Sequence, residues 1–124
     1  MKNKVYWYDT GFIPNLYVGF TTSEKAYKKY MRKLAIADYP EFVTSGAGAT
    51  THFYTNDDCN RIALVCMTTR DDLVPAQYAA MITHECVHVW QEAEELMRET
   101  VKGEVEAYAI QYFTQRMLED FWDD

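Results

Sequence analysis

The residues best suited to chemistry lie within five positions, in the sequence His84-Glu85-Cys86-Val87-His88. In a helix, His84 and His88 lie one turn and about 40° apart, so both imidazoles can bind one ion. Zn²⁺ accepts imidazole nitrogen readily. Glu85 lies about 60° beyond His88, which puts its carboxylate beside a metal-bound water rather than on the metal. The pattern predicts a bound zinc ion with Glu85 as the general base of a hydrolytic reaction.

A third protein ligand is expected, because catalytic zinc sites usually have three and leave the fourth position to water. No third histidine follows the motif closely, but Glu104 and Glu106 open the last expected helix. They lie about 200° apart around that helix, so only one of them can face the metal. Glu104 shares its face with apolar and aromatic residues, where an unpaired carboxylate is costly to bury and a bound cation removes that cost. We predict Glu104 as the third ligand, with Glu106 as the alternative.

The H-E-x-x-H sequence at 84–88, followed by E-x-x-A at 104–107, resembles the gluzincin branch of zinc metallopeptidases. The chain is closest in size and layout to compact minigluzincin domains, and it is similar to the small peptidase domains associated with phages and mobile elements. The resemblance covers roughly residues 50–115. It implies a peptide or protein substrate, Glu85 as base and proton shuttle, and zinc bound by His84, His88 and Glu104. Many relatives carry Asp or Asn four residues after the glutamate ligand, where this chain has Tyr108.

Further groups could assist catalysis. The resemblance implies that a substrate peptide lies along an edge strand above the helix, and strands expected at 50–55 and 61–68 could serve by strand addition. His52 could point into the cleft and stabilise the oxyanion; an exposed strand histidine is the alternative interpretation. Tyr108 or Tyr112 could donate a hydroxyl to the tetrahedral intermediate, with ordinary packing as the alternative for either.

The elements that must position these residues form one α+β domain over residues 1–124. We expect a short, mainly antiparallel sheet, one early helix and two long C-terminal helices that pack antiparallel. Asp71 or Asp72 is expected to cap the first long helix, and Cys86 to face the core as a small buried residue. The expected strands are 5–8, 16–20, 50–55 and 61–68, and the expected helices are 24–37, capped by Thr22 or Ser23, then 75–97 and 101–121.

Composition narrows the function classes. The formal charge is −7 and no clustered basic face stands out, so a nucleic-acid partner is not expected. No apolar run approaches the roughly 20 residues that cross a bilayer, and no secretory signal is recognisable. Three unpaired cysteines suit a reducing compartment, so we expect a cytoplasmic protein. The competing hypothesis is a zinc-binding interaction or assembly protein with weak or no catalytic activity, for instance one encoded by a phage or mobile element.

Overall fold

The computed structural model describes residues 3–98 and 102–123. Within these ranges the chain is α+β, as the sequence predicts, with four strands in one sheet and three helices. The strands are β1 (Tyr6–Tyr8), β2 (Leu16–Thr21), β3 (Ala49–Thr55) and β4 (Arg61–Met67), and the helices are α1 (Glu24–Lys33), α2 (Pro75–Met97) and α3 (Glu104–Trp122).

The sheet is mixed, with the strand order β1-β2-β4-β3. Two hairpins are present, because β1 pairs antiparallel with β2 and β3 pairs antiparallel with β4. The central pair, β2 with β4, is parallel. This order places β4 inside the sheet and β3 at its edge. Of the two strands that could receive a substrate peptide, only β3 is therefore in an edge position.

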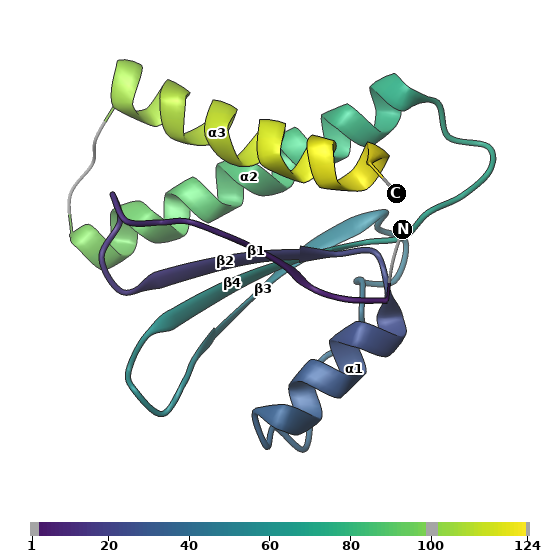
Figure 1. Ribbon diagram of the computed structural model, residues 1–124, viewed down its shortest axis with the longest axis horizontal. Helices are drawn as coiled ribbons and strands as arrows, with labels where there is room; N and C mark the ends of the chain where they lie inside the picture. The colour runs from purple at the N-terminus through teal and green to yellow at the C-terminus, as the bar shows by residue number, and fades with distance from the viewer. Residues whose placement is uncertain (1–2, 99–101, 124) are drawn as a thin grey trace.

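Helices cover the two faces of the sheet unequally (Figure 1): α2 and α3 lie over one face, and the shorter α1 lies over the other. Strand β4 contributes to both layers. Ala63, Val65 and Met67 join the core under α2 and α3, while Leu64 and Cys66 join a smaller core under α1. Burial on both faces explains why β4 is an uninterrupted apolar run rather than an alternating one.

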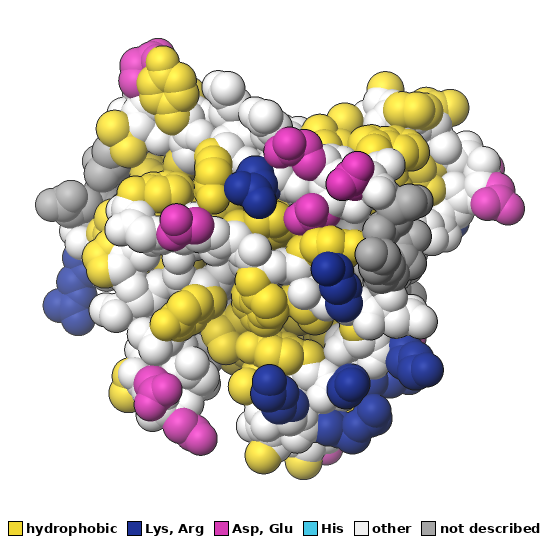
Figure 2. Space-filling view, in the orientation of Figure 1, with side chains coloured by type: hydrophobic (Ala, Val, Ile, Leu, Met, Phe, Trp, Pro, Cys, Tyr) yellow, Lys and Arg dark blue, Asp and Glu magenta, His cyan; other side chains and the backbone are white. Residues whose placement is uncertain are grey.

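Helix α1 begins as expected but ends early. The Ser23 hydroxyl accepts a hydrogen bond from the Ala26 amide at 3.0 Å, which identifies Ser23 as the N-cap. The helix ends at Lys33 instead of residue 37, because Ala35 adopts a left-handed backbone with φ of 58°. No clustered basic face was expected from the sequence, but the exposed side of α1 gathers basic side chains (Figure 2): Lys25, Lys28, Lys29, Arg32 and Lys33.

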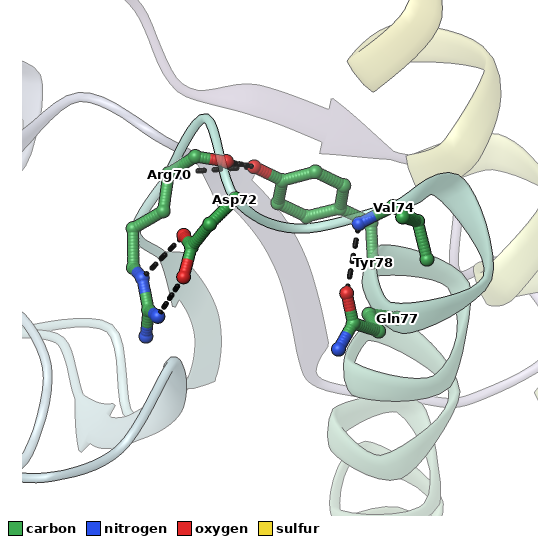
Figure 3. Close-up of polar contacts among 5 residues, drawn as sticks. All are labelled: Arg70, Asp72, Val74, Gln77 and Tyr78. Carbon is green, nitrogen blue, oxygen red and sulfur yellow. Dashed lines mark hydrogen bonds and ion pairs between the residues drawn. The ribbon is translucent and has the colours of Figure 1, made fainter.

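The residues that cap the start of α2 differ from those predicted (Figure 3). Neither expected aspartate caps the helix: Asp72 instead forms an ion pair with Arg70, at 2.5 Å. The N-cap residue is Val74, whose amide donates to the Gln77 side-chain oxygen at 2.8 Å, and Pro75 follows at the first helical position. The Tyr78 hydroxyl donates to the Arg70 carbonyl oxygen at 2.6 Å and accepts from the Arg70 amide at 2.9 Å. These bonds fix where the helix that carries the H-E-x-x-H sequence begins.

Helices α2 and α3 pack antiparallel, as predicted. Tyr78, near the start of α2, contacts Phe121 near the end of α3, with 4.8 Å between ring centroids. Further along α2, the Cys86 thiol lies 3.7 Å from the Met117 sulfur. Residue 101, the predicted start of the last helix, lies outside the described residues, and the helix begins at Glu104. No helix in the described ranges combines the length and apolar character needed to cross a membrane.

Candidate metal centre

The two histidines of the motif face each other on the exposed side of α2. The Nε2 atoms of His84 and His88 are 3.2 Å apart. Two imidazole nitrogens bound to one tetrahedral zinc ion, at about 2.0–2.1 Å each, are separated by about 3.3 Å. The rings therefore already have the spacing that one zinc ion requires, which confirms the local helix geometry expected from the i, i+4 spacing.

The tautomer of the neutral His88 ring is set by a neighbour one turn further along. Its Nδ1 lies 2.9 Å from the side-chain oxygen of Gln91. Because an amide oxygen only accepts hydrogen bonds, Nδ1 carries the proton and donates it. The Nε2 lone pair of His88 is then directed toward His84. Histidines that bind metals usually have such a partner on the second nitrogen, which fixes the tautomer and the ring orientation.

Glu85 is buried between α2 and β3, with 6% of its surface exposed. One carboxylate oxygen, Oε1, accepts a hydrogen bond from the Thr51 hydroxyl at 2.8 Å. The other, Oε2, lies 3.9 Å from Nε2 of His84. The bond to Thr51 orients the carboxylate, so that Oε2 is the oxygen on the side of the histidines and can accept a proton there.

A pocket of about 350 Å³ opens beside these groups. His84 and Glu85 form part of its wall, and the rest comes from residues at or just before the start of β3 and from α2: Ala47, Gly48, Ala49, Ala80 and Met81. Gly48 has no room for a side chain, because a Cβ at this position would lie 2.5 Å from the Met81 sulfur. Since His84 and Glu85 both line the pocket, a group that enters it from the β3 side of α2 can approach both.

The predicted third ligands lie elsewhere. Cys86, which contacts α3, is about 160° around α2 from each histidine, so α3 packs on the side of α2 away from them. Glu104 is exposed in the first turn of α3, and Glu106 forms an ion pair with Lys102 at 3.5 Å. Among the described residues, no three His, Cys, Asp or Glu side chains are grouped so as to hold a metal. The structure brings together His84, His88 and Glu85, but neither Glu104 nor Glu106.

The two tentative catalytic residues are also away from the motif. His52 is buried on the opposite face of the sheet, where its Nε2 lies 2.8 Å from the Phe42 carbonyl oxygen and its ring stacks on Tyr27. His52 therefore neither points into the cleft, as an oxyanion role requires, nor lies exposed on the strand. Tyr108 is 63% exposed on α3 and lines a separate pocket with Tyr112.

Cys86 is confirmed as a core residue. It is fully buried, and burial raises the pKa of its thiol to about 12, which makes it a poor metal ligand at neutral pH.

Sequence reasoning missed two residues of the site. Gln91 could have been found from its i, i+3 spacing to His88, a distance at which helical side chains meet. Thr51 has no comparable local signal, since its role depends on which face of β3 is turned toward α2.

Comparison with known proteins adds no relative: no family model, curated protein or solved structure matches the chain.

Proposed function

We propose that this protein is a zinc-dependent peptidase that binds the metal through His84 and His88 and uses Glu85 as its general base. The observation that carries the proposal is the joint geometry of three adjacent groups. The histidine nitrogens have the spacing of two ligands on one ion, and a buried carboxylate lies 3.9 Å from one of them. Gln91 and Thr51 orient these groups from outside the motif.

Each residue has a defined part in hydrolysis. The metal would polarise the scissile carbonyl and lower the pKa of the attacking water. Glu85 accepts the proton of that water on Oε2 and delivers it to the leaving amine. Thr51 keeps Oε1 engaged, so the carboxylate does not rotate away from the histidines. The pocket beside His84 admits the substrate.

The edge position of β3 supports a peptide as the substrate. An extended peptide can add to a free sheet edge through backbone hydrogen bonds, which accept many sequences. β3 lies against α2 at the level of Glu85, through the bond from Thr51. A peptide added along β3 would therefore run past the proposed metal site.

The decisive experiment is Glu85→Gln, with Glu95→Gln as the matched control, because Glu95 is exposed on the same helix. Zinc content is measured by metal analysis and hydrolysis by mass spectrometry of a peptide library. We expect Glu85→Gln to keep its zinc and lose at least about 100-fold of its hydrolytic rate, the usual contribution of a general base. Glu95→Gln should match the wild type. Hydrolysis that persists in Glu85→Gln would disprove the role of Glu85.

A second candidate function is supported by the position of α3. Only two of the three predicted ligands come together in the described residues. A zinc-binding interaction or assembly protein needs no further catalytic group. One zinc per chain, with no cleavage of any library peptide by the wild type, would favour this function over hydrolysis.

A further inference from the structure

A second pocket, of about 640 Å³, lies between the connection from β1 to β2 and the first half of α3. Figure 2 shows hydrophobic side chains gathered at this place, at the left of the view. The lining is mostly apolar and carries one carboxylate, and it consists of Asp9, Gly11, Phe12, Val105, Tyr108, Ala109 and Tyr112. The pocket shares no lining residue with the proposed metal centre.

Aromatic rings form the walls of this pocket. The rings of Phe12 and Tyr112 stand almost perpendicular, with 5.7 Å between their centroids and 86° between their planes. Tyr108 lies one helical turn before Tyr112 on the same side of α3. Phe12 and Tyr108 are 52% and 63% exposed, large values for aromatic residues in a folded chain. Ala109, whose side chain is small, completes the lining beside these rings.

The single charged group of the lining is Asp9. Its Oδ1 accepts a hydrogen bond from the Gly11 amide at 2.9 Å, which holds the carboxylate beside Phe12. No Lys or Arg is among the described residues that line the pocket. Arg116, one turn beyond Tyr112 on α3, is not part of the lining, and its guanidinium lies 5.9 Å from the centre of the Tyr8 ring. The negative charge of Asp9 is therefore available to a ligand.

We propose that this pocket binds an alkylammonium cation, carried by a small molecule or by a lysine side chain. The faces of aromatic rings attract cations, and groups of aromatic rings form the cages that bind quaternary and methylated ammonium ions. The volume lies in the range of small-ligand sites, which combine apolar walls with a few polar groups. An anionic ligand is disfavoured by Asp9, and a neutral apolar ligand would leave that charge without a partner.

The test compares choline with 3,3-dimethylbutan-1-ol, a neutral molecule of the same shape. Both are titrated into the metal-free protein and followed through its backbone amide NMR signals, with sodium chloride at equal ionic strength as the blank. We expect choline to shift the amides of residues 9–12 and 105–112, and to bind at least about fivefold more tightly than the alcohol. Equal binding of the two molecules, or no saturable shift in these residues with any cation, would overturn the proposal.

Two variants locate the cation. Asp9→Asn keeps the oxygen that accepts from Gly11 and removes the charge, and Tyr108→Ala removes an exposed ring. We expect each to weaken choline binding by about threefold to tenfold. Asp58→Asn and Tyr17→Ala, exposed positions outside the pocket, are the controls and should bind as the wild type does. Unchanged binding in both Asp9→Asn and Tyr108→Ala would also overturn the proposal.

A second binding experiment, with peptides, identifies the source of the ammonium group. A short peptide containing trimethyllysine is compared with the same peptide containing norleucine. Binding of the lysine peptide assigns the pocket to a protein partner, whereas binding of choline alone assigns it to a small molecule. Both outcomes support an ammonium site, and neither depends on the zinc proposal.

Discussion

At the scale of single residues, the second ring nitrogen of His88 is the part of the site most open to experiment. Gln91 accepts a hydrogen bond from Nδ1 and thereby directs Nε2 toward His84. Gln91→Ala should lower zinc affinity about 10- to 100-fold, the usual effect of losing such a partner. Gln91→Glu should retain affinity, because a carboxylate also accepts from Nδ1. Competition with a chromophoric chelator measures both. Equal affinity of Gln91→Ala and the wild type would show that His88 needs no partner.

Thr51 allows a separate test of how Glu85 is oriented. Thr51→Val removes the hydroxyl that donates to Oε1 and keeps the shape of the side chain. A hydrogen bond to a charged group contributes about 1.5–3 kcal/mol, so kcat should fall by about tenfold or more while zinc content and KM stay close to the wild type. Thr51→Ser retains the hydroxyl and should recover most of the rate. A loss shared equally by the valine and serine variants would indicate a packing role instead.

The residues that could be predicted are those related by local helix geometry. His84, Glu85 and His88 belong to one turn of α2, so their mutual positions follow from helix parameters once the segment is helical. His52 could not be placed in this way. Successive strand residues point to opposite faces, and an error of one position exchanges Thr51 for His52 at the side facing α2. That choice depends on packing between distant segments.

At the scale of whole elements, the side of α2 on which α3 packs decides the ligand set. Glu104 was predicted from the polarity of its own helix face. Its distance from the histidines, however, depends on the contact between Cys86 and Met117, which places α3 on the other side of α2. The two-helix arrangement was predictable from periodicity, and its antiparallel direction from the short connection. The side of α2 on which α3 packs could not be predicted from either feature.

The packing of α3 leads to a prediction that distinguishes two ligand sets. One is the pair of histidines that the structure brings together, and the other adds Glu104, as the family resemblance implies. If zinc is bound by the histidines as they stand, Glu104→Gln and Glu106→Gln should each bind zinc within about twofold of the wild type. His88→Ala is the positive control and should lose at least about tenfold, since it removes a direct ligand. Isothermal titration of the metal-free proteins measures all three. A loss in Glu104→Gln as large as in His88→Ala would assign Glu104 to the metal and would require α3 to pack differently.

At the scale of the whole molecule, the class of fold was predictable and the sheet order was not. Hairpins form between neighbouring segments, so β1 with β2 and β3 with β4 could be paired from turns and alternation. The parallel pairing of β2 with β4 joins segments separated by α1 and β3, and no local pattern indicates it. Charge differs from sheet order in this respect. The total of −7 is a property of composition, but the basic side of α1 follows from the helical spacing of its Lys and Arg residues and could have been found in the sequence.

The small core beneath α1 should make the whole fold sensitive to alkaline pH. Tyr27 is fully buried there, and its hydroxyl donates to the Pro40 carbonyl oxygen at 2.6 Å. Burial, with a smaller contribution from Cys66, raises the pKa of Tyr27 to about 12. In the unfolded chain a tyrosine ionises near pH 10. Between about pH 10 and 12 the folded chain therefore binds more protons, so its stability falls as pH rises and is fully present only below about pH 10.

Tyr27→Phe tests this assignment. The variant loses the hydrogen bond to Pro40 and should be about 1 kcal/mol less stable at pH 8. Since phenylalanine cannot ionise, the free energy of unfolding should fall less steeply than in the wild type, and the two curves should converge as pH approaches 11.5. Burial also raises the pKa of Cys66, so some decline persists in the variant. Urea unfolding of the metal-free proteins, followed by circular dichroism from pH 8 to 11.5, measures both curves; parallel curves would exclude Tyr27 as a source of the alkaline instability.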